Sequence, residues 1–211
     1  SLALASLTSG KNYDVFVYDN AGTLTLELSA AWTNDTTRAD SIVRQDGVWC
    51  KTGALTRRLV GTIRTTGTAT TADAEVATRY VWNASNRVER PIRVVESTVS
   101  WTYSTAAFRA ANGNSANALQ YVVGLSEDPV SARVHAALLT GGSDTGVGVG
   151  IGVDSTTVNS AGVSGTALRS SQYGWAEACY KGYPGVGYHS LTWLEYSSAA
   201  TTTWYGVSTP H

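Results

Sequence analysis

The fold of this chain is decided near its start by the stretch Tyr13-Asp-Val-Phe-Val-Tyr18, Asp19-Asn-Ala-Gly22 and Thr23-Leu-Thr-Leu-Glu-Leu-Ser29. In the third part, leucines alternate with Thr, Glu and Ser, so an extended strand places every leucine on one face. The four residues in the middle include Asn and Gly, which tolerate the positive φ angles of tight turns. The stretch therefore predicts a β-hairpin.

The same period of two recurs along the rest of the chain, for example where Val99, Trp101 and Tyr103 alternate with Ser and Thr. Alternation and strand-forming composition predict further strands at 56–65, 90–96, 119–125, 131–139, 174–181, 187–196 and 201–207. Many short strands separated by Gly, Asn and Ser are typical of a sandwich or barrel. We expect an all-β fold, specifically an antiparallel β-sandwich.

Three local features refine this expectation. The last two strands are expected to form a hairpin through residues 197–201, and short helices are expected only at 36–44 and 71–82. The run Asn86-Arg-Val-Glu-Arg-Pro91 interrupts the strand pattern. We therefore predict a smaller β-rich module at 1–90, truncated at its N-terminus, and a jelly-roll-like β-sandwich at 91–211.

Composition excludes several functional classes. The chain has 211 residues, of which 15% are charged, and a formal net charge of −1. Because phosphate contacts need a concentrated basic face, and no Lys/Arg block exists, we expect no nucleic-acid partner. No apolar run approaches the roughly 20 residues that span a bilayer, so no membrane span is expected. The start lacks Met and a basic segment, which favours an internal cut over a signal peptide.

Cysteine and histidine are scarce. Cys50 and Cys179 belong to no CxxC or Cys/His cluster, so they are either two structural thiols or one long-range disulfide. With only three histidines, the chain offers little material for a His-based metal site or catalytic triad. We expect neither a metal nor a cofactor.

The segment Val147-Gly-Val-Gly-Ile-Gly-Val153 is unusual. Its glycines alternate strictly and no helix is expected after it, whereas a dinucleotide fingerprint needs strand, glycine loop and helix in that order. Gly148, Gly150 and Gly152 leave one face of a strand bare, so another sheet, an aromatic ring or a neighbouring subunit can approach the backbone. We interpret the segment as a packing strand, with these glycines as candidate subunit contacts and ligand contact as the alternative.

Residues 173–205 contain nine Tyr and Trp residues. Flat aromatic faces with polar edges suit sugar stacking and protein interfaces alike, although most such residues belong to the core or rim of a sandwich. The candidate ligand-binding residues are those in or beside Gly-rich loops: Tyr173, Trp175, Tyr183 and Tyr188.

No catalytic constellation stands out. A glycosidase needs two carboxyl groups flanking the sugar, and Glu177 and Glu195 would supply them only if their strands were paired. No nucleophile elbow and no calcium loop is present. We therefore expect no catalytic residues and no enzyme, and a polysaccharide depolymerase is kept as an alternative.

Several strings together resemble a group of bacteriophage and prophage virion proteins described as tail-fibre-like. The strings are Asn12-Tyr-Asp-Val-Phe-Val-Tyr-Asp-Asn-Ala-Gly22, Leu28-Ser-Ala-Ala-Trp-Thr-Asn-Asp-Thr-Thr-Arg38, Gln45-Asp-Gly-Val-Trp49, Arg57-Arg-Leu-Val-Gly-Thr-Ile-Arg64, Arg93-Val-Val-Glu-Ser-Thr98 and Tyr188-His-Ser-Leu-Thr-Trp-Leu-Glu195. The similarity covers nearly the whole chain. It departs at Asn83-Ala84, where familiar members carry an aromatic pair, and it transfers no site residue.

The resemblance implies a non-enzymatic structural component at the virion surface: a fibre, spike or decoration protein. Its expected partners are other virion proteins, host-surface glycans and further copies of itself, with a homotrimer favoured by analogy with phage fibres. Two alternatives remain open. One is a carbohydrate-binding module or lectin, and the other is a capsid-surface protein with a purely assembling or stabilising role.

Overall fold

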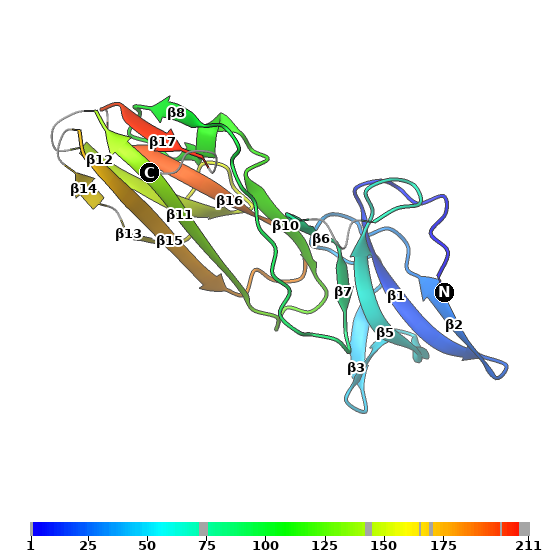
Figure 1. Ribbon diagram of the computed structural model, residues 1–211. Coiled ribbons are helices and arrows are strands. Elements are labelled where there is room, and N and C mark those ends of the chain that lie inside the picture. The colour runs from blue at the N-terminus through cyan, green and yellow to red at the C-terminus, as the bar shows by residue number, and fades with distance from the viewer. Residues whose placement is uncertain are drawn as a thin grey trace. The chain divides into compact units, whose positions relative to one another are not determined.

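The computed structural model describes residues 2–71, 76–141, 145–164, 166–168, 171–198 and 200–206. Within them the chain is all-β, as the sequence predicts, with one three-residue 3₁₀ turn at Ala111–Gly113 (Figure 1). No helix in this part of the chain has the length and apolar character needed to cross a membrane.

The chain forms two compact units. The first comprises Ser1–Ile92, Gln120–Asp128 and Gly185–His189, and the second comprises Arg93–Leu119, Pro129–Pro184 and Ser190–His211. The chain therefore passes between the units five times. The predicted division at residue 90 differs from this arrangement. It assigned residues 120–128 and 185–189 to the second module, whereas the structure places both segments in the first unit.

The first unit contains a sheet in the order β2 (Thr23–Leu28), β1 (Asn12–Asn20), β5 (Ala54–Arg64), β4 (Val48–Lys51) and β3 (Ile42–Gln45), with β7 (Val81–Asn83) also pairing β5. All these pairs are antiparallel. A short parallel pair joins β6 (Thr78–Arg79) to β10 (Ala118–Val123).

The predicted first hairpin is confirmed. Strands β1 and β2 pair up to Asn20 opposite Thr23, and the two residues of the turn, Ala21 and Gly22, have φ angles of 51° and 86°. The Gly22 N–H donates to the Asp19 carboxylate over 2.7 Å, which holds the turn. Positive φ at both central residues gives the type I′ geometry that matches strand twist.

The β3–β4 hairpin has the same kind of turn, with φ angles of 48° at Asp46 and 82° at Gly47. An Asp-Gly pair between strand-forming runs is a strong hairpin signal. The sequence prediction missed this hairpin, and placed a helix at 36–44 instead. That helix is wrong, because β3 begins at Ile42 and the described residues before it are irregular.

Segments distant in sequence share the core of the first unit. One cluster consists of Phe16, Leu59, Trp82, Val122 and Leu125. A side chain at Gly124 would overlap the Trp82 ring, so only glycine lets this segment pass so close to the indole. The return segment 120–128 is therefore part of this unit's core.

The second unit is a sandwich of two sheets packed face to face (Figure 1). One contains β14 (Thr166–Leu168), β12 (Thr145–Val153) and β16 (Gly187–Ser197), with β9 (Arg109–Ala110) pairing β16. The other has the order β13 (Gly162–Ser164), β15 (Tyr173–Gly182), β11 (Val130–Thr140), β17 (Thr202–Tyr205) and β8 (Ser100–Tyr103). Buried side chains from both sheets meet between them, namely Leu138, Val149, Ile151, Ala176, Ala178 and Trp204.

From β11 onward, successive strands alternate between the two sheets, which is the connectivity expected of a jelly-roll-like sandwich. This alternation makes the predicted hairpin at 197–201 wrong, because β16 and β17 lie in opposite sheets and β17 pairs with β11 and β8. Strands predicted at 56–65, 174–181 and 187–196 are confirmed, and β17 lies within the strand predicted at 201–207.

Two other predicted elements differ from the structure. Residues 90–96 form no strand. In the predicted helix at 71–82, Thr71 forms an isolated bridge with Thr65, and β6 and β7 occupy the end. The remainder of that prediction, at 72–75, lies outside the described residues.

Candidate functional site

The outer face of the β13–β15–β11–β17–β8 sheet carries a group of aromatic side chains. On β11, Ala137 pairs with Trp175 of β15 on one side and with Tyr205 of β17 on the other. Because side chains alternate along a strand, Tyr173 and Trp175 share a face. The buried Ala176, which follows Trp175, and the buried Leu138, which pairs with Gly174, point into the sandwich. The register thus places rings from three strands on one surface.

These rings form two contacting pairs on one surface, which we call the aromatic face: His135, Tyr173, Trp175 and Tyr205. The His135 imidazole stacks on the Trp175 indole with ring centroids 4.7 Å apart and planes 3° apart. Tyr173 and Tyr205 lie 6.0 Å apart, with planes inclined by 30°. Tyr173 is 66% exposed and Trp175 58% exposed, so both rings present open surface.

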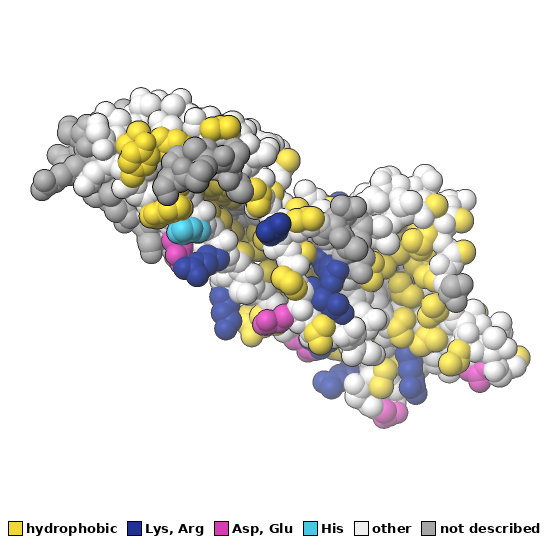
Figure 2. Space-filling view, viewed as in Figure 1, with side chains coloured by type: hydrophobic (Ala, Val, Ile, Leu, Met, Phe, Trp, Pro, Cys, Tyr) yellow, Lys and Arg dark blue, Asp and Glu magenta, His cyan; other side chains and the backbone are white. Residues whose placement is uncertain are grey.

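Figure 2 shows this face, with hydrophobic side chains beside a histidine and an acidic and a basic side chain next to it. The charged neighbours are Arg133 and Glu177, whose Nη2 and Oε2 atoms are 2.6 Å apart. Their hydrogen bond lowers the pKa of Glu177, and Glu177 in turn raises the pKa of the exposed Cys179 thiol, 3.4 Å away. The polar edge of the aromatic face is therefore a neutral ion pair.

Two of the four predicted ligand-binding residues, Tyr173 and Trp175, lie on this face. Tyr183 is also exposed, at 68%, but it follows the end of β15 and stands eight residues beyond Trp175. That separation corresponds to about 26 Å along an extended chain. Sequence reasoning missed His135 and Tyr205 as partners, because alternation alone does not give strand register.

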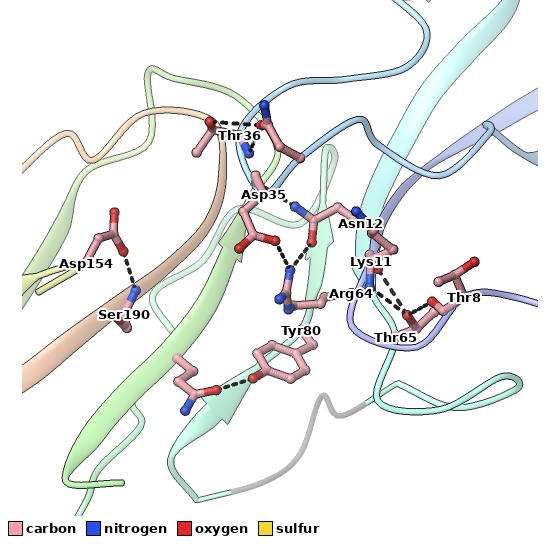
Figure 3. A network of polar contacts seen from close by, with 12 residues as sticks. Thr8, Lys11, Asn12, Asp35, Thr36, Arg64, Thr65, Tyr80, Asp154 and Ser190 are labelled. Carbon is pink, nitrogen blue, oxygen red and sulfur yellow. Dashed lines mark hydrogen bonds and ion pairs between the residues drawn. The ribbon is translucent and has the colours of Figure 1, made fainter. Parts of the chain in front are cut away.

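Tyr188, the fourth predicted residue, belongs to the first unit and is half-buried there. The Arg64 guanidinium lies 3.7 Å above its ring, and Tyr80 meets it edge-on at 6.1 Å. Burial is the main reason that its pKa rises to about 12. Arg64 also donates to Asn12 and Asp35 over 3.0 and 2.7 Å (Figure 3), so Tyr188 packs against a polar network.

The bare face of β12 is covered by residues of the same chain. A Cβ at Gly150 would lie 2.5 Å from Asn159 Oδ1 and 3.1 Å from Phe108, and a Cβ at Gly152 would overlap the Ser155 carbonyl oxygen. The three glycines proposed as subunit contacts, Gly148, Gly150 and Gly152, are all buried. Packing within the chain explains the glycines at 150 and 152, and all three positions are already buried in the single chain.

The two carboxylates considered for catalysis do not face each other across paired strands, because Glu177 lies on β15 and Glu195 on β16 of the opposite sheet. Glu195 is fully buried and accepts hydrogen bonds from Trp101 Nε1 (2.6 Å), Arg109 Nε (2.8 Å) and the Asn112 backbone (3.2 Å). Burial raises its pKa. Glu195 therefore has a structural role, because its hydrogen bonds hold β16 to the segment around Arg109.

Metal-ligating groups and the cysteines give no further site. Among the residues that the structure describes, no cluster of three or more His, Cys, Asp or Glu side chains is placed to hold a metal ion. Both cysteines are free thiols, Cys50 buried and Cys179 exposed.

Comparison with known proteins adds no assignment: no family model matches the chain, and no curated protein matches it. A binding role is therefore inferred from the chain's own side chains, above all from the aromatic face.

Proposed function

We propose that this chain is a non-enzymatic structural protein of a bacteriophage particle, located at the virion surface, whose second unit binds host-surface carbohydrate through the aromatic face. The virion role rests on the resemblance of its strings to tail-fibre-like proteins. The binding role rests on one observation, which is that rings from three neighbouring strands, with those of His135, Tyr173 and Trp175 exposed, lie on one face of a sheet.

The geometry suits a sugar because a pyranose ring has an apolar C–H face and a polar rim, which match an aromatic face and its polar edges. His135 covers one face of the Trp175 indole, and 58% of the Trp175 residue stays exposed for contact with a ligand. The buried Trp204 and Leu138 support the sheet from beneath. A rigid surface of this kind loses little conformational entropy on binding.

The test is a pair of variants, Trp175→Ala and Tyr173→Ala, compared on an array of bacterial surface oligosaccharides and then by calorimetry with the best-bound member. We expect Trp175→Ala to weaken binding at least tenfold, which corresponds to about 1.4 kcal/mol. The melting temperature should change by only about 1–2 °C, because both side chains are largely exposed.

Tyr183→Ala is the matched control, since Tyr183 is equally exposed but remote from the aromatic face. It should bind like the wild type. Wild-type affinity in both Trp175→Ala and Tyr173→Ala would contradict the proposed site.

A role purely in assembly is the second candidate, favoured by the same exposed rings, because aromatic residues are enriched at the centres of protein interfaces. In that case the wild type would bind no glycan, and Trp175→Ala would reduce oligomer yield. Light scattering separates the two. We expect a homotrimer by analogy with phage fibres, and a stable monomer would contradict the view that this chain builds a fibre by itself.

A further inference from the structure

The charges around the aromatic face indicate which chemical class of carbohydrate fits it, and this step rests on the proposed function. The second unit has only five Lys or Arg and five Asp or Glu residues, and hence no net charge. The strands of the β13–β15–β11–β17–β8 sheet, which bears the aromatic face, carry three Lys, Arg, Asp or Glu residues: Arg133, Glu177 and Lys181.

None of these three offers a free charge beside the rings. Arg133 and Glu177 neutralise each other through their 2.6 Å contact. Lys181 stands six residues beyond Trp175 on β15, about 20 Å along the strand. An acidic sugar docked on the rings would therefore lose hydration at its carboxylate without gaining an unpaired cation from the described strands of this sheet.

The opposite side of the aromatic face ends in hydroxyl groups. In the row that contains Tyr173, β11 supplies Leu139, β17 supplies Thr203, and β8 supplies the exposed Thr102. In the adjoining row, Ser100 pairs with Tyr205. Hydroxyls donate and accept hydrogen bonds without charge, and so they match sugar hydroxyls.

We propose that the aromatic face binds a neutral glycan, built from uncharged hexose or N-acetylhexosamine units, in preference to a polysaccharide that carries carboxylate, sulfate or phosphate groups. The rings supply stacking, the Ser and Thr hydroxyls supply orientation, and the Arg133–Glu177 pair adds no net charge at the edge.

The test measures binding to two sets of probes at pH 7.5, in 50 mM and 500 mM NaCl. The neutral set is malto-, cello- and chito-oligosaccharides together with a neutral bacterial O-polysaccharide, and the acidic set is hyaluronate, polygalacturonate and polysialic acid. We expect the tightest binding within the neutral set, with Kd changing less than twofold between the two salt concentrations. Trp175→Ala should weaken this binding at least tenfold, whereas Arg133→Gln should change it less than twofold.

The possible failures are distinguishable. If the tightest ligand is acidic, is weakened tenfold or more by salt and by Arg133→Gln, and still depends on Trp175, the neutral-glycan inference is wrong while the proposed site stands. If no probe binds, or if binding is unaffected by Trp175→Ala, both the proposed site and this inference are overturned.

Discussion

Replacing Gly152 with alanine is expected to destabilise the second unit strongly, whereas the same change at Gly146 on the same strand is expected to be nearly neutral. At Gly152 the new methyl group would overlap the Ser155 carbonyl oxygen and lie 3.1 Å from that of Val158. Both obstacles are backbone atoms, which a side-chain rotation cannot move. Overpacking of this kind costs about 1–3 kcal/mol, and we expect the upper end, corresponding to about 6–12 °C in Tm.

Gly150 and Gly146 complete the series. A methyl group at Gly150 would meet the Asn159 and Phe108 side chains at 2.5 and 3.1 Å, which can partly move, so we expect about 1–2 kcal/mol. At Gly146 the nearest atom is Ser198 Oγ at 3.4 Å, an ordinary contact. There the lower entropy of the unfolded alanine chain offsets the small packing cost, and the change should stay within about 0.5 kcal/mol.

Urea unfolding gives the free energies by linear extrapolation, and light scattering of the same samples gives the molecular mass. The expected order of destabilisation is Gly152→Ala, then Gly150→Ala, then Gly146→Ala, with no change in mass. Equal stability of all three variants would refute the packing interpretation. A fall in mass, with a concentration-dependent Tm, would instead show that the glycine strand is a subunit contact.

Two further predictions concern titratable groups. Burial tends to raise the pKa of Glu96, but hydrogen bonds outweigh this and lower it to about 2. The ionised group therefore stabilises the fold above its unfolded pKa of about 4.5, and this contribution disappears as the pH falls towards 2. Unfolding of Glu96→Gln should accordingly show a stability loss at pH 7 that shrinks between pH 4.5 and 2, and a loss independent of pH would contradict this. In native protein a thiol reagent should label Cys179 and leave the buried Cys50 unmodified, and Glu177→Gln should accelerate the labelling because it removes the carboxylate that raises the thiol pKa. Equal labelling of both thiols, or an unchanged rate in the variant, would count against this account.

The sequence predicts individual strands well because the period of two is a local property. The hairpin at 19–22 could be predicted from the sequence because its turn residues and both of its strands are contiguous in the chain. The connection at 197–201 shows the limit of this reasoning. A short polar link between two strands is typical of a hairpin. Strands β16 and β17 nevertheless lie in opposite sheets, and each buries its own side chains, such as Leu194 on β16 and Trp204 on β17. Alternation states which side chains point inward, but not which strand is the neighbour.

The candidate site shows the same limit. Tyr173 and Trp175 were predicted as ligand-binding residues because they lie in or beside a Gly-rich loop, and the structure places both of them, exposed, on one face of β15. The stacking of His135 on Trp175 depends on the register between β11 and β15, which joins residues about 40 positions apart. For Tyr188, proximity in sequence to the other aromatic residues was misleading, because the chain re-enters the first unit at 185–189.

Because residues 120–128 and 185–189 return to the first unit, the two units cannot be exchanged or engineered as separate segments of the gene. Neither unit corresponds to one uninterrupted stretch of coding sequence, so recombination at a single boundary cannot exchange one unit and leave the other intact. A product ending at residue 92 would keep Phe16 and Trp82 but lose Val122 and Leu125, which pack against them. Under the proposed function, changes in glycan preference are therefore expected to accumulate by substitution on the outer face of the β13–β15–β11–β17–β8 sheet, rather than by the exchange of one terminal segment.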